Sequence, residues 1–131
     1  MQLYLVRHAE AAPGEPDELR ALTPEGLEAA RALARRLAAE GVRADVVLTS
    51  PLLRARETGE AIAEALGCRS EPSEELAAGA TAESVRRAVA GRGQTVVAVG
   101  HQPDCGRIAA ELTGGEEPRF PPAGMIRIEL P

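Results

Sequence analysis

The chain has 131 residues, of which 44% are hydrophobic and 27% are charged, and its formal net charge is −5. This length and composition predict one globular domain over residues 1–131 and exclude an intrinsically disordered chain. The acidic balance argues against nucleic acid as a partner, and no apolar run is long enough for a membrane span. Two cysteines, Cys68 and Cys105, are too few for a disulfide framework or a four-ligand zinc site. Without a signal peptide at the N-terminus, we expect a cytoplasmic protein with reduced thiols.

The first half of the chain alternates predicted strands and helices. An apolar run over residues 3–6 predicts a buried strand, and residues 9–22, which contain three breakers, predict a loop. Thr23-Pro24 is a typical helix start, and apolar residues then recur at helical spacing until Gly41. A second apolar run at residues 46–48 predicts another strand.

The rest of the chain repeats this plan. Ser50-Pro51 predicts the cap of a helix over residues 52–66, and Thr81 that of a shorter helix ending at Val89. Residues 95–99 form the most strand-like run, and a helix over residues 104–112 follows it. Residues 125–130 alternate as an edge strand does.

Strands that alternate with helices predict an α/β fold, a three-layer domain with a mainly parallel sheet flanked by helices. Such sheets bind ligands at the carboxyl ends of their strands. The chain's two histidines, His8 and His101, each follow a predicted strand. Arg7 precedes His8, and Arg54 and Arg56 lie shortly after the second strand, so we expect these side chains to meet at one edge of the sheet.

This combination of residues favours phosphoryl chemistry. Histidine can serve as a nucleophile, a general acid or a metal ligand. Arginines beside the histidines would repel a metal cation, whereas the planar guanidinium matches the oxygens of phosphate. We therefore expect a protein nucleophile and neither a metal nor a cofactor.

Three blocks of the sequence resemble the histidine phosphatase superfamily, which includes the cofactor-dependent phosphoglycerate mutases. They are Val6-Arg7-His8-Ala9-Glu10, the run from Ser50 to Thr58 and Val99-Gly100-His101, and they occur in the family's order. The resemblance extends to about residue 113 and is closest to the short phosphohistidine phosphatase branch (SixA type), which lacks a lid subdomain. It implies a phosphoglycerate mutase-like fold for the whole chain.

The resemblance also implies roles for individual residues. His8 would be the nucleophile that takes the phosphoryl group, and Arg7, Arg54 and His101 would surround its oxygens. The family's proton donor is an acid after the second helix, for which Glu75 is the best match and Glu74 is possible. Backbone N–H groups near Gln102 could add to the phosphate pocket.

The sequence departs from the larger members of that family. Ala9 replaces the usual glycine, the asparagine that they carry a few residues later is missing, and the stretch from Glu75 to the next strand is too short for a helical lid. These departures argue against mutase activity and favour an open site that admits a phosphorylated protein surface.

The sequence-based hypothesis is a phosphatase acting on phosphohistidine in a protein. One alternative is a small-molecule phosphomonoesterase acting on a sugar phosphate or a nucleotide-type ester. Another is a non-catalytic module that binds phosphate or a phosphoprotein. The retained histidine pair disfavours the binding module, because anion binding needs only arginines and helix N-termini.

Overall fold

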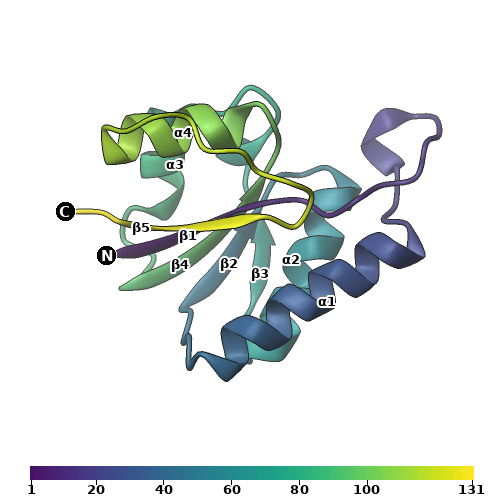
Figure 1. Ribbon diagram of the computed structural model, residues 1–131, viewed down its shortest axis with the longest axis horizontal. Coiled ribbons are helices and arrows are strands. Elements are labelled where there is room, and N and C mark those ends of the chain that lie inside the picture. Colours follow the sequence, from purple (N-terminus) through teal and green to yellow (C-terminus); the bar gives the residue numbers. More distant parts are fainter.

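Five strands form the central sheet of the computed structural model, which describes residues 1–131. In sheet order they are β3 (Ser70–Pro72), β2 (Val46–Thr49), β4 (Thr95–Gly100), β1 (Gln2–Arg7) and β5 (Met125–Glu129). The first four are parallel, and β5 pairs antiparallel with β1 at the edge (Figure 1). The sequence predicted this mainly parallel sheet and its edge strand.

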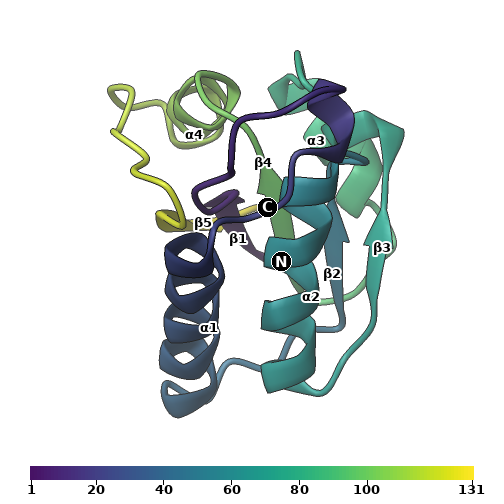
Figure 2. The same ribbon diagram turned by 90° about the vertical axis from the view of Figure 1, so that its right-hand side faces the viewer.

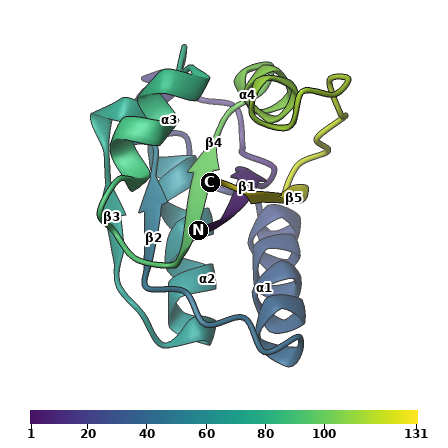
Figure 3. The same ribbon diagram turned by 90° about the vertical axis from the view of Figure 1, so that its left-hand side faces the viewer.

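Helices cover both faces of the sheet, so the domain has the predicted three layers. One face packs against α1 (Pro24–Ala39) and α2 (Leu53–Leu66), and the other against α3 (Ala82–Val89) and α4 (Asp104–Thr113) (Figures 1 and 3). Successive strand side chains point to opposite faces. Leu3 and Leu5 therefore join the core beneath α3 and α4, while Tyr4 and Val6 join the core beneath α1 and α2.

The helix boundaries follow from local chemistry. The Thr23 hydroxyl accepts a hydrogen bond from the Gly26 N–H at 2.9 Å, which caps α1 as the sequence predicted. Thr81 and Ser84 form a capping box at the start of α3. Gly67 ends α2 with a φ of 69°, in the left-handed region that favours glycine.

Three short elements complete the chain. Two are single 3-10 turns, η1 (Asp17–Leu19) and η2 (Glu74–Leu76), and the third is the strand β3, which the sequence analysis did not predict. Between β3 and β4 the chain holds only η2 and α3, so it carries no lid subdomain. None of the helices has the length and apolar character that a membrane span requires.

Candidate active site

The pairing of β1 with β4 brings the two histidines together. Arg7 lies opposite Gly100 in the parallel register, so His8 and His101 both follow the paired ends. The His8 N–H donates to the Gly100 carbonyl at 3.0 Å, which extends the pairing by one residue. The two imidazole rings meet edge to face, with centroids 5.2 Å apart. This juxtaposition was expected from the sequence.

One ring nitrogen of His8 has a fixed role. Its Nδ1 lies 2.7 Å from the Ala9 carbonyl oxygen. Because a carbonyl only accepts hydrogen bonds, Nδ1 carries the proton and the Nε2 lone pair is available for attack. Burial lowers the pKa of His8, and the charges of Arg54, Arg7 and Arg20 lower it further, against the opposing effect of the Ala9 bond. The imidazole is therefore neutral at pH 7.

A side-chain relay fixes the backbone beside His8. The Ala9 N–H donates to the Thr58 hydroxyl at 3.0 Å, and that hydroxyl donates to the Arg54 carbonyl at 2.8 Å. Thr58 is fully buried, so water does not compete for these bonds. The first turns of α2 thus set the position of the His8 backbone.

His101 is also neutral and firmly held. Its Nε2 lies 2.6 Å from the Ser50 hydroxyl oxygen, and the residue is buried. Burial lowers its pKa to about 4, with further contributions from His8 and Arg54. The sequence-based prediction that Ser50 caps α2 is wrong, because the helix begins only at Leu53 and its N-cap is Leu52. The Ser50 hydroxyl accepts from the Leu52 N–H at 3.3 Å and also contacts His101.

Two arginines are positioned by segments far away in the sequence. Arg7 Nη1 donates to the Phe120 carbonyl at 2.9 Å, and its buried Nε has no partner. Arg54 is nine-tenths buried and donates from Nη1 to the Asp17 carbonyl at 3.0 Å. Both charges lower the pKa of His8.

The structure adds two residues that the sequence analysis missed, Asp17 and Arg20. Asp17 Oδ2 lies 3.3 Å from Arg54 Nη2, and its Oδ1 lies 3.0 Å from Arg20 Nη1. Arg20 Nε also donates to the Ala12 carbonyl at 2.8 Å. The only signal in the sequence was their place in the loop that follows the first strand.

The other predicted site residues have partners of their own. Glu75 is on η2, where its carboxylate accepts two hydrogen bonds from Arg87, at 3.1 and 3.0 Å. Those bonds lower the pKa of Glu75. The Gln102 side chain accepts from the Gly106 N–H at 2.8 Å and so stabilises the first turn of α4. Glu74 and Arg56 line a separate small hollow near the end of β3.

A neutral nucleophile among fixed cations suits an anionic substrate. Arg7 and Arg54 supply guanidinium N–H groups that can donate to the oxygens of an anion. No group of three or more His, Cys, Asp or Glu side chains comes together in a way that could hold a metal ion. The chemistry that this arrangement can perform is attack by His8 on a phosphoryl group.

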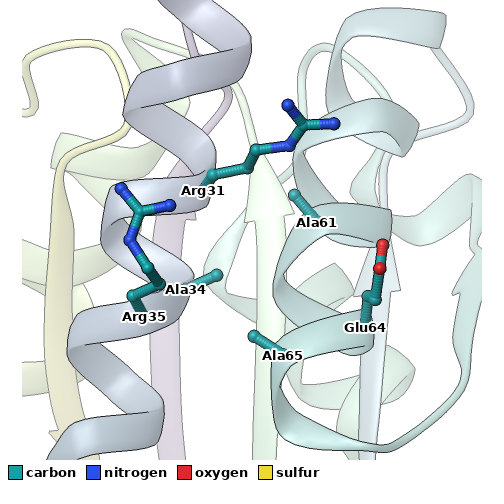
Figure 4. Close-up of a pocket in the computed structure, with 6 residues that line it drawn as sticks. All are labelled: Arg31, Ala34, Arg35, Ala61, Glu64 and Ala65. Carbon is teal, nitrogen blue, oxygen red and sulfur yellow. The ribbon is translucent and has the colours of Figure 1, made fainter.

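A second hollow lies between α1 and α2, with Arg31 and Arg35 along one side and Glu64 on the other (Figure 4). Its floor is formed by alanines, and Arg35 is already paired with Glu28 at 2.8 Å. It contains no nucleophile, so the paired histidines at the strand ends are the better candidate for an active site.

The chain matches one family model and several known proteins. Residues 3–79 match the model of the histidine phosphatase superfamily (branch 1). An uncharacterised protein of Picosynechococcus sp. is 38% identical over 124 residues, which cover 88% of this chain and 75% of that protein. Phosphohistidine phosphatase SixA of Escherichia coli is 34% identical over 125 residues, which cover 90% of this chain and 78% of that protein.

A solved structure agrees with these sequence matches. The protein histidine phosphatase SixA complexed with tungstate superposes with a TM-score of 0.89 at 28% identity. The alignment covers 98% of this chain and 88% of that one. The similarity therefore extends over the whole domain, including the segments that contribute His8 and His101.

Proposed function

Because the chain belongs to the histidine phosphatase superfamily (branch 1), we propose that it removes a phosphoryl group from phosphohistidine on a protein, through a phosphohistidine intermediate on His8. One observation carries this proposal. His8 is neutral, and the Ala9 carbonyl fixes its protonated Nδ1, so Nε2 can attack with His101 beside it and the charges of Arg7 and Arg54 acting on it.

The reaction has two steps. In the first, His8 Nε2 forms a bond to phosphorus while the bond to the leaving nitrogen breaks, and the leaving imidazole takes up a proton from solvent water. In the second, a water oxygen attacks the phosphorus, the bond to Nε2 breaks, and the water releases a proton. Inorganic phosphate leaves, and His8 returns to its neutral form.

The cationic groups stabilise the charge that spreads over the three equatorial oxygens of the transition state. Arg7 and Arg54 are fixed by Phe120 and Asp17 before a substrate arrives, so they need little reorganisation. The structure of the related SixA was solved as a complex with tungstate, an oxyanion of similar shape to phosphate, and we expect this chain to bind the same class of ligand.

Two features favour a phosphorylated protein over a small phosphate ester. The short connection between β3 and β4 leaves the pocket without a lid that would enclose a small substrate. Glu75, the candidate proton donor, is ionised and paired with Arg87, and imidazole departs more easily than an alkoxide does. A small sugar phosphate or nucleotide-type ester is the alternative substrate.

A substrate panel tests this proposal. We expect kcat/KM to be highest for a phosphohistidine-containing protein, such as a phosphorylated histidine phosphotransfer domain, and lower for phosphoserine, sugar phosphates and nucleotides. A different protein that carries its phosphoryl group on aspartate serves as the control for a phosphorylated protein surface without an imidazole leaving group. A strong preference for a sugar phosphate would favour the small-molecule phosphatase, and phosphate binding without any turnover would favour a binding module.

The proposed reaction needs neither a metal nor a cofactor. Extensive dialysis against EDTA should leave the rate unchanged, and vanadate, which mimics the pentacoordinate transition state, should inhibit. Activity that is lost on chelation and restored by zinc or magnesium would contradict this mechanism.

A further inference from the structure

Residues 9–22 cross the carboxyl ends of the strands and place η1 beside the start of α2 (Figure 2). Both side-chain hydrogen bonds of Arg54 go to one residue of this segment, Asp17. Nη1 donates to the Asp17 carbonyl at 3.0 Å, and Nη2 donates to the Asp17 carboxylate at 3.3 Å. A main-chain oxygen and a carboxylate therefore share the guanidinium in the free site.

The carboxylate of Asp17 is ionised and movable. The Arg20 hydrogen bond lowers its pKa, and Arg54 lowers it further, so it is negatively charged at neutral pH. Its side chain is 61% exposed, whereas the Arg54 side chain is only 10% exposed. The contact thus joins a fixed cation inside the pocket to an anion that has room to move at the surface.

We propose that Asp17 determines the affinity of the site for phosphate, because its carboxylate occupies Arg54 in the free enzyme and the substrate's phosphoryl group takes its place. This inference rests on the proposed function in one respect, namely that Arg54 binds the phosphoryl oxygens. Two anions on one guanidinium repel each other, so binding must displace the carboxylate or work against it.

The remaining contacts are suited to such an exchange. When the carboxylate leaves, the Asp17 carbonyl still holds Arg54 Nη1, so the guanidinium keeps its place. Arg20 contacts the other carboxylate oxygen at 3.0 Å and offers it a partner outside the pocket. Nη2 of Arg54 then becomes available to an oxygen of the substrate.

The exchange costs the same free energy for free phosphate and for a phosphorylated protein, but the two ligands differ in what offsets this cost. Inorganic phosphate has only the pocket to bind, and it meets the full competition of Asp17. A protein substrate makes additional contacts outside the pocket that offset this competition. The expected benefit is faster release of the phosphate product.

Calorimetric titration of the full chain with inorganic phosphate and with tungstate tests this proposal at neutral pH. Asp17→Asn keeps the carbonyl contact and removes the charge, so we expect Kd to fall about three- to tenfold for both anions. Asp17→Glu should remain near the wild-type value. Glu18→Gln makes the same change of net charge at the neighbouring residue and should change Kd less than twofold, about the limit set by screening.

The direction in which Asp17→Asn changes the Kd for the anion decides whether the proposal holds. Weaker or unchanged anion binding in Asp17→Asn, in a variant whose circular dichroism melting curve matches that of the wild type, would overturn the proposal. A purely structural role for Asp17 predicts weaker binding. The Arg54→Lys variant distinguishes failure of this proposal from failure of the proposed function. If its Kd for phosphate equals that of the wild type, Arg54 does not bind the phosphoryl oxygens and the phosphate site itself has been misassigned.

Discussion

The side chains at the carboxyl ends of β1 and β4 are held by different kinds of contact from those of the segment between β3 and β4. At the first, His8 and His101 are held by a main-chain carbonyl and a buried hydroxyl, at 2.7 and 2.6 Å. At the second, Glu75 lies on a single 3-10 turn, and its carboxylate is tied to the surface residue Arg87. The first region is fixed before any substrate binds, whereas the second has no contact that directs its carboxylate toward His8.

The two regions differ in the step of the proposed reaction that they support. The strand ends suit attack on phosphorus, whereas the segment that carries Glu75 is poorly suited to protonating a leaving group. Attack on phosphorus needs a neutral, oriented imidazole and fixed cations, and the strand ends provide both. Protonation of a poor leaving group needs a carboxylic acid with a raised pKa, whereas Arg87 lowers the pKa of Glu75. A leaving group that needs little help, such as imidazole, matches this division.

Replacing the nucleophile should have the largest effect. We expect His8→Ala to lower kcat at least about 10⁴-fold on every phosphorylated substrate, because no covalent intermediate can form. The thermal melting temperature should change little, since His8 lies outside the two hydrophobic cores. Mass spectrometry after an alkaline quench should detect a phosphoenzyme in the wild type and none in the variant. Near-native turnover by His8→Ala would refute the assignment of the nucleophile.

Removing a cation from the same region should come second. Arg54→Ala should lower kcat/KM about 10²- to 10³-fold by removing charge stabilisation from the transition state. Arg56→Ala is the matched control, because Arg56 lies two residues away and donates to the Pro51 carbonyl at 3.0 Å. Similar losses of kcat/KM in the two variants would mean that the overall positive charge at this edge of the sheet matters more than the position of the Arg54 guanidinium.

Much of the prepared region could be predicted from the sequence. Short apolar runs identified β1 and β4, and the rule that parallel strands end at one edge brought His8 and His101 together. Thr23 and Thr81 were recognised as caps because that chemistry involves residues only three apart. Ser50 was misjudged because its hydroxyl bonds to His101, fifty-one residues away, a partner that no local pattern reveals.

The remaining elements depend on tertiary contacts. Residues 70–72 have no typical strand pattern, and they form β3 because they pair with residues 47–49 of β2. Asp17 and Arg20 lie in a segment without periodicity, so its path across Arg54 was not predictable. The position of Glu75 beside Arg87 likewise follows from the packing of α3 against η2.

The pH dependence tests whether the strand ends hold a neutral imidazole. The ordinary pKa of histidine is 6.5, and burial lowers that of His8, so the active neutral form persists below pH 6.5. We expect kcat/KM to be flat near pH 7 and to fall about tenfold per pH unit only below the lowered pKa. Arg20→Gln removes one of the charges that lower this pKa and should shift the acidic limb upward. An acidic limb at or above pH 6.5 in the wild type would contradict the neutral pocket.

The smallest effect is expected at Glu75. Glu75→Gln should lower kcat/KM for alkyl phosphates by no more than about tenfold, because an ionised carboxylate paired with Arg87 is a poor proton donor. For a phosphohistidine protein the loss should be smaller still, since the leaving imidazole depends less on an acid. Glu74→Gln is the control for the charge change on the same turn. The measurement is kcat/KM for both substrates in the three proteins. A loss well beyond tenfold on either substrate would place Glu75 at the reacting bond and remove the distinction between the two regions.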